Sequence, residues 1–206
     1  MRRLFVLIVG VALSAPLPVA AQQDAPPSME VARLMQGLAS CIGASQPAMV
    51  DDMLALPLMS QEQNLFIAQS LGSEQECMRQ LPTTLRFQPP ALVGGLAEEM
   101  FLSRHAEQDT KWIVAHNAAA KPRNEPEDLA LCIVGRNPGV TRALLDTIPS
   151  SDEERMLATK LAPALGSCLP TGMTLSFAPS NVRTFAAMGL YLSARAAPGQ
   201  QAAARP

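Results

Sequence analysis

Four cysteines divide this 206-residue chain at regular intervals. Cys41 and Cys77 are 36 residues apart, Cys132 and Cys168 are also 36 residues apart, and the second pair follows the first by 91 residues. Equal spacing of this kind indicates an internal repeat, in which each copy forms one structural unit. The repeat limits the possible folds strongly, because each local structure has to be formed twice.

The residues around the cysteines support the repeat. Matching segments recur in the same order with slips of one residue: Leu38-Ala39-Ser40-Cys41-Ile42 with Leu129-Ala130-Leu131-Cys132-Ile133, Met53-Leu54 with Leu144-Leu145, Leu56-Pro57 with Ile148-Pro149, and Leu85-Arg86-Phe87 with Leu175-Ser176-Phe177. Ser60-x-x-Gln63 and Ser151-x-x-Glu154 are two capping boxes, and each predicts the start of a helix.

Hydrophobic periodicity within each copy predicts helices. In residues 29–43, for example, Val31, Leu34, Leu38 and Ile42 recur at spacings of three and four, which places them on one helical face. We therefore expect an all-α fold of two tandem, disulfide-stapled helical units that are related by internal duplication and packed as one compact domain. The expected organisation is a signal peptide at 1–21, a flexible N-terminus at 22–28, helical unit 1 at 29–103, a connector at 104–125, helical unit 2 at 126–195 and a disordered tail at 196–206.

The first 21 residues have the pattern of a cleaved signal peptide. Arg2 and Arg3 precede an apolar run of about 12 residues, and small residues end the segment at Val19-Ala20-Ala21. The run is shorter than the roughly 20 residues that a membrane-spanning helix needs, although a retained anchor is the alternative. We expect a periplasmic or secreted protein that does not contact the membrane after cleavage.

Export makes disulfides the expected state of Cys41, Cys77, Cys132 and Cys168. The duplication favours Cys41–Cys77 with Cys132–Cys168, because each unit then closes its own loop. Pairing between the units remains open, as does a single zinc ion bound by all four thiolates.

Charge is distributed unevenly along the chain. Residues 22–110 contain 4 Arg against 11 Asp and Glu, whereas residues 111–206 contain 10 Lys and Arg against 7 Asp and Glu. The formal net charge of −2 argues against nucleic-acid binding, which needs a basic excess. Oppositely charged halves could attract each other or a neighbouring copy head to tail, and ordinary variation in surface charge is an equal alternative. The expected partner is a protein, or a second copy bound through the unit junction.

Few residues suggest chemistry, and they lie in the connector. His105 and Asp109 are one turn apart if their segment is helical, and Trp112 follows on the same segment. On a continuous helix His116 would lie about 16 Å from His105, too far for both histidines to bind one ion. We expect no catalytic, cofactor-binding or metal-binding residue. The alternative is a hydrolase or metal-dependent enzyme that uses His105, Asp109 and a carboxylate of Glu98 or Glu99. A third possibility is redox sensing by the cysteines, which stable oxidation of all four would exclude.

The duplicated pattern around the cysteines resembles a family of small exported proteins of sphingomonad-type bacteria that carry a repeated Cys-containing helical unit. The resemblance covers nearly all of the mature chain, and it implies an exported protein with a repeat but no activity and no functional residue. The sequence thus favours a non-enzymatic, exported helical module for binding or structure, with a groove expected at the junction of the units near Trp112.

Overall fold

The computed structural model describes residues 29–70, 75–79, 89–169 and 178–197, and these segments are helical without strands. The signal-peptide region and residues 22–28 lie outside them. The helices are α1 (Met29–Ser45), α2 (Pro47–Ala55), α3 (Gln61–Ser70), α4 (Gln75–Met78), α5 (Pro89–His105), α6 (Thr110–Ala119), α7 (Glu125–Arg136), α8 (Pro138–Leu145), α9 (Asp152–Cys168) and α10 (Pro179–Arg195). The prediction of a compact all-α fold is confirmed.

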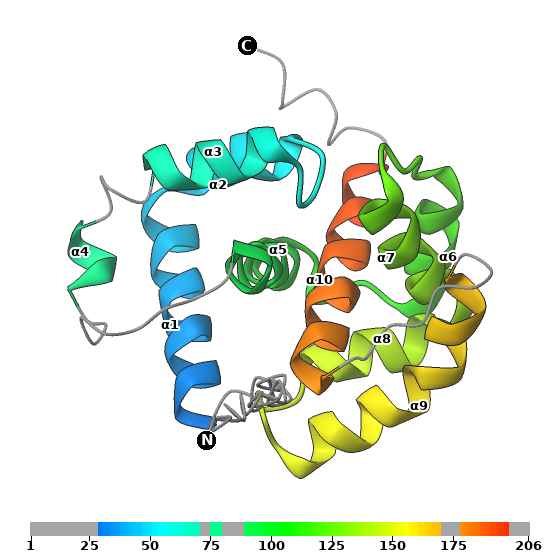
Figure 1. Cartoon of the computed structure of the whole chain (residues 1–206). Coiled ribbons are helices and arrows are strands. Elements are labelled where there is room, and N and C mark those ends of the chain that lie inside the picture. The colour runs from blue at the N-terminus through cyan, green and yellow to red at the C-terminus, as the bar shows by residue number, and fades with distance from the viewer. Residues whose placement is uncertain (1–28, 71–74, 80–88, 170–177, 198–206) are drawn as a thin grey trace, which may run out of the picture.

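Two long helices, α5 and α10, pack against each other at the centre of the molecule (Figure 1). Helices α1 to α4 lie on the α5 side, and α6 to α9 gather around α10. The core is made of Leu, Ile, Val, Met and Ala, and its largest fully buried side chain is Phe101 of α5. The central helices are buried most extensively because both halves pack on them.

Sequence signals set the helix boundaries. Pro47 and Pro138 occupy the first turns of α2 and α8, where a missing N–H leaves no hydrogen bond unmade. Both capping boxes form: the Ser60 hydroxyl accepts from the Gln63 amide, and the Ser151 hydroxyl accepts from the Glu154 amide, each at 3.1 Å. The predicted helix starts are confirmed.

The turns before α3 and α9 have the same geometry. Met59 and Ser150, 91 residues apart, both adopt the left-handed backbone region, with φ of 60° and 61°. From 61 to 69 and from 152 to 160, the alternation of buried and exposed residues is also identical. The two halves therefore repeat one local structure, while their origin by duplication stays a prediction.

Both predicted disulfides form. Cys41–Cys77 joins α1 to α4, and Cys132–Cys168 joins α7 to the end of α9. Each closes a loop of 36 residues, for which the chain-entropy model gives about 3–4 kcal/mol of stabilisation. Pairing between the units and a four-thiolate zinc site are thereby excluded.

Two details of the predicted organisation differ from the structure. Residues 110–119 of the connector form helix α6, because Asp109 caps its N-terminus and Ile113 is buried in the core. Ala196 and Ala197, expected to begin the tail at 196–206, belong to the folded part, since Ala196 closes α10 with backbone hydrogen bonds and Ala197 is buried. Residues 198–206 lie outside the described segments. None of the described helices has the length and hydropathy that crossing a membrane requires.

Candidate functional site

The connector residues predicted as candidates lie on both sides of a turn. Helix α5 ends at His105, and α6 begins five residues later, after a turn that includes Asp109. The Asp109 carboxylate accepts a hydrogen bond from the Trp112 amide at 2.8 Å and thereby caps α6. Among the described residues, no hydrogen bond or ion pair joins Asp109 to His105.

The premise of a continuous helix through both histidines is wrong. Because the chain turns after α5, the rings of His105 and His116 both lie against Trp112, with centroid separations of 5.4 and 4.2 Å. Phe101 extends this group at 5.9 Å from His105. We call these four residues the ring column. It packs the start of α6 against the end of α5.

The environment of the ring column holds His105 neutral. Burial lowers the pKa of His105, and the nearby charges of Arg104 and His116 lower it further. His116 places its Nδ1 2.7 Å from the Trp112 carbonyl, which is a hydrogen bond when Nδ1 carries the proton. The two histidines thus contribute to packing and to a local contact with the backbone.

The carboxylates weighed as partners of His105 are engaged elsewhere. Glu99 accepts a hydrogen bond of 2.6 Å from the Ser40 hydroxyl, which joins α5 to α1. Glu98 is buried and forms an ion pair with Arg183 of α10. In the described part of the chain, no group of three or more His, Cys, Asp or Glu side chains is placed to hold a metal ion.

Arg183 is the centre of a buried network between the halves. Its Nε and Nη2 donate to Glu98 at 2.8 and 2.6 Å, and Nη1 lies 3.4 Å from Glu154. The remaining donors reach the carbonyls of Leu144 and Leu145. One guanidinium thus satisfies a carboxylate from each half, which compensates for the cost of burying these charges.

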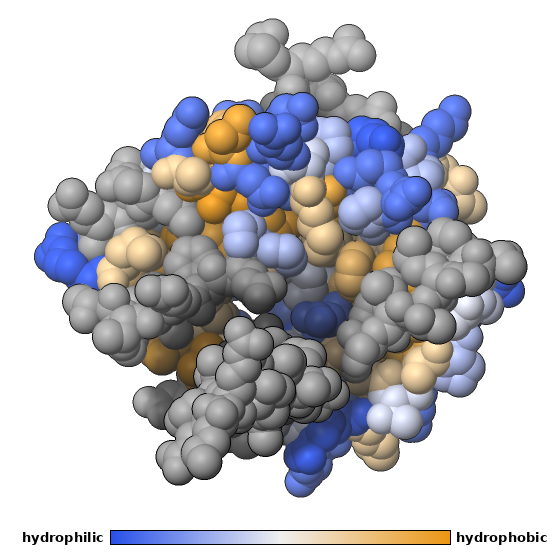
Figure 2. Space-filling view, in the orientation of Figure 1, coloured by the Kyte–Doolittle hydropathy of each residue, from blue (hydrophilic) through white to orange (hydrophobic). Residues whose placement is uncertain are grey.

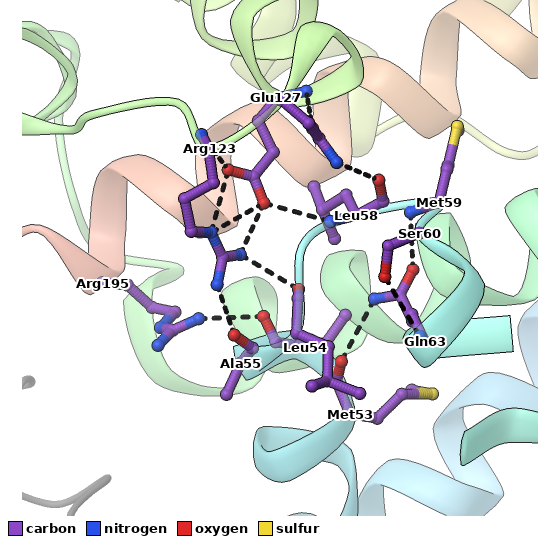
Figure 3. A network of polar contacts seen from close by, with 12 residues as sticks. Met53, Leu54, Ala55, Leu58, Met59, Ser60, Gln63, Arg123, Glu127 and Arg195 are labelled. Carbon is purple, nitrogen blue, oxygen red and sulfur yellow. Dashed lines mark hydrogen bonds and ion pairs between the residues drawn. The ribbon is translucent and has the colours of Figure 1, made fainter. Parts of the chain in front are cut away.

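A second polar network clamps the connector to the first half (Figure 3). Glu127 of α7 is fully buried, and its carboxylate accepts 3.0 Å hydrogen bonds from the Leu58 amide and the Arg123 Nε. Arg123 also donates to the carbonyls of Ala55 and Leu56 at the end of α2. A cation at this position complements the negative end of the helix dipole.

The same turn of the first half receives two further contacts from the second half. The Asn124 amide donates to the Leu58 carbonyl, and Arg195 of α10 donates to the Leu54 carbonyl, each at 2.8 Å. Within the first half, Gln63 donates to the Met53 carbonyl at 3.1 Å. Backbone groups at the end of α2 and in the turn before α3 are therefore hydrogen-bonded by the connector and the start of α7, by α10 and by Gln63 of α3 (Figure 3).

Two opposing effects act on the pKa of the Glu127 carboxylate. Burial alone would raise the pKa of Glu127, but hydrogen bonds from Arg123 and from the Leu58 amide outweigh it and hold that pKa below its usual value. The carboxylate is therefore charged at neutral pH and fully engaged.

A cavity of about 340 Å³ lies between α9 and the start of α10. Its lining consists of apolar residues and one threonine: Ala158, Thr159, Ala162, Leu165, Gly166, Leu169, Pro179 and Val182. The small side chains on one face of α9 leave the space, and Leu165 and Val182 form its buried part. We call this cavity the α9–α10 pocket. It can accept an uncharged, apolar group.

The groove expected at the junction near Trp112 stays a prediction, and α5 and α10 themselves pack tightly where they meet. A Cβ atom built on Gly94 would lie within 3 Å of Thr184, so these helices are in direct contact. On the face seen in Figure 2, hydrophilic residues border the exposed apolar ones. The α9–α10 pocket lies within the second half.

Sequence reasoning missed this pocket and both polar networks. The spacing of Ala158, Ala162 and Gly166 is a visible signal for a small-residue face of a helix, but its partner, the start of α10, is distant in sequence. No family model, curated protein or solved structure matches this chain significantly.

Proposed function

We propose that this protein is an exported, non-enzymatic binding module that holds a small apolar molecule in the α9–α10 pocket. The observation that carries the proposal is the pocket lining, which includes no charged side chain among the described residues. A volume of about 340 Å³ falls at the lower end of the range for small-molecule sites, about 300–1,000 Å³. Such pockets are mostly apolar, and their affinity comes from the release of water from apolar surface.

The placement of the polar residues supports binding in preference to catalysis. Asp109 caps a helix, Glu98 and Glu127 are paired with arginines, and His105 is buried between two rings. These groups hold the fold together, so none of them faces a shared reaction centre.

Export to the periplasm or the medium is part of the proposal. Two disulfides are typical of proteins in oxidising compartments, and the first 21 residues have the signal-peptide pattern. The Cys132–Cys168 disulfide and the Arg183 network involve residues next to the pocket lining, and restraint of this kind lowers the entropy cost of binding.

Binding of N-phenyl-1-naphthylamine, an uncharged fluorescent apolar probe, tests the proposal. Ala162→Phe places a ring in the pocket and is expected to weaken probe binding by about tenfold or more. Ala68→Phe is the matched control, because Ala68 is an exposed alanine on α3, outside the pocket. Equal loss in both variants, or no probe binding by the folded wild-type protein, would contradict the proposal.

A further inference from the structure

The Cys132–Cys168 disulfide lies directly beside the α9–α10 pocket. Cys168 is the last residue of α9, and the lining residues Gly166 and Leu169 flank it in sequence. The bond joins this end of α9 to the middle of α7. The position of one wall of the pocket therefore depends on the disulfide.

The two ends of α9 are held by different means. Glu154, near the start, is fixed by its capping contact with Ser151 and by Arg183. Pro163 interrupts the helix in the middle, because proline has no N–H to donate to the preceding turn. Beyond Pro163, the end of α9 is held by packing and by Cys132–Cys168, so loss of the bond acts on this end first.

The two disulfides differ in exposure. Cys132 and Cys168 are both partly exposed; in the other disulfide Cys41 is partly exposed as well, and Cys77 is only 2% exposed. A thiolate can therefore approach both residues of Cys132–Cys168 but only one residue of Cys41–Cys77. Thiol–disulfide exchange begins with attack of a thiolate on a sulfur atom, so its rate depends on access to that atom. Reduction should therefore reach Cys132–Cys168 before Cys41–Cys77.

We propose that Cys132–Cys168 is a redox control of the α9–α10 pocket, so that its reduction by a dithiol weakens ligand binding. This inference rests on the proposed function. The dithiol attacks one sulfur, a mixed disulfide forms, and the second thiol of the reductant resolves it. The S–S bond of the protein is replaced by two thiols, and the reductant, having given up two electrons and two protons, becomes a disulfide.

Graded reduction with dithiothreitol tests the order of reduction. Thiols released at each concentration are alkylated and located by peptide mass spectrometry, while helix content is followed by circular dichroism. We expect Cys132 and Cys168 to be labelled first, with helix content retained. Earlier or simultaneous labelling of Cys41 and Cys77 would overturn the inference, as would general unfolding at the first step.

Probe binding tests the coupling to the pocket. The Cys132→Ser/Cys168→Ser variant is expected to bind N-phenyl-1-naphthylamine about tenfold more weakly than the oxidised wild type, even without dithiol. The matched variant Cys41→Ser/Cys77→Ser should bind like wild type when oxidised and should lose affinity when Cys132–Cys168 is reduced. If the first variant is unfolded, the comparison uses wild-type protein alkylated after the first reduction step.

The outcomes separate this inference from the proposed function. Oxidised wild-type protein that binds the probe equally well after reduction of Cys132–Cys168 overturns the redox control alone. Oxidised wild-type protein that does not bind the probe overturns the proposed function, and the redox control with it.

Discussion

Gly94 of α5 lies against Thr184 of α10 at the centre of the molecule. A Cβ atom built on Gly94 would be 2.9 Å from the Thr184 Cα and 2.8 Å from its Cγ2. Each is the sixth residue of its helix, because α5 begins at Pro89 and α10 at Pro179. The two halves thus touch through equivalent positions, as they do across a two-fold axis.

Gly94→Ala should destabilise the protein. The added methyl group would collide with the Thr184 backbone, and overpacking of this kind costs about 1–3 kcal/mol, more than the gain of about 1 kcal/mol in helix propensity. The measurement is the free energy of unfolding in urea. Gly37→Ala in α1 is the control, because its Cβ atom would meet nothing within 4 Å. That variant should be more stable than wild type, so a stabilised Gly94→Ala protein would contradict the packing argument.

Arg123→Ala should destabilise the clamp on the first half by about 2–3 kcal/mol. The substitution leaves the buried Glu127 carboxylate without its cation, and the expected loss is below the 3–5 kcal/mol of a fully buried pair because 35% of the Arg123 side chain is exposed. Chemical unfolding monitored by circular dichroism measures the effect. Arg79→Ala is the control, since its ion pair with Glu76 is exposed.

The same pair predicts a dependence on pH. The pKa of Glu127 is lowered in the folded protein, so its stabilising effect is complete above the unfolded pKa of about 4.5 and is lost as the pH falls through the folded value. The stability difference between wild type and Arg123→Ala should therefore shrink in acid. A difference that stays constant down to pH 3 would show that Glu127 is not the group that Arg123 stabilises.

Arg183→Met should be more damaging, with a loss of about 3–5 kcal/mol, because it leaves buried Glu98 and Glu154 without a cation. Adding Glu98→Gln and Glu154→Gln to this variant should recover part of the loss, since the uncompensated charges are then removed. Unfolding free energies of the single and triple variants provide the comparison. If the triple variant is no more stable than Arg183→Met, charge burial is not the cause.

Acidification should weaken the ring column. Because the pKa of His105 is lowered on folding, the unfolded state takes up this proton first as the pH falls below about 6.5, and stability decreases. His105→Phe keeps a ring between Phe101 and Trp112 but cannot be protonated. The loss of unfolding free energy between pH 7.5 and 5 should be smaller in this variant than in wild type, with Trp112 fluorescence as the readout. Equal losses would show that His105 does not cause the pH dependence.

Local features of the fold could be predicted from the sequence because they depend on neighbouring residues. The capping boxes at Ser60 and Ser151 mark helix starts through contacts three residues away. The repeat predicts the disulfide pairing, because equal spacing favours a bond within each unit. The Gly94-Gly95 pair within a helix is also a visible sequence signal for close packing of that helix.

Contacts between distant segments could not be predicted in this way. Glu98 and Arg183 are 85 residues apart, and nothing in the sequence around either residue indicates that the two form an ion pair. The ring column depended on a turn after His105, which periodicity did not indicate. The pocket depends on how the end of α9 faces the start of α10. Hydrophobic periodicity indicates which face of a helix is apolar, but it does not indicate which other helix packs against that face.

The contacts that Arg123 and Glu127 make with the first half determine when that half can complete its hydrogen bonds during synthesis. A chain is made from its N-terminus, so the α2–α3 turn exists before the residues that satisfy its amides and carbonyls have been polymerised. Glu98 lacks its ion-pair partner for longer still, until Arg183 has been added to the chain. The buried polar contacts of the first half can therefore be completed only when almost the whole polypeptide has been made.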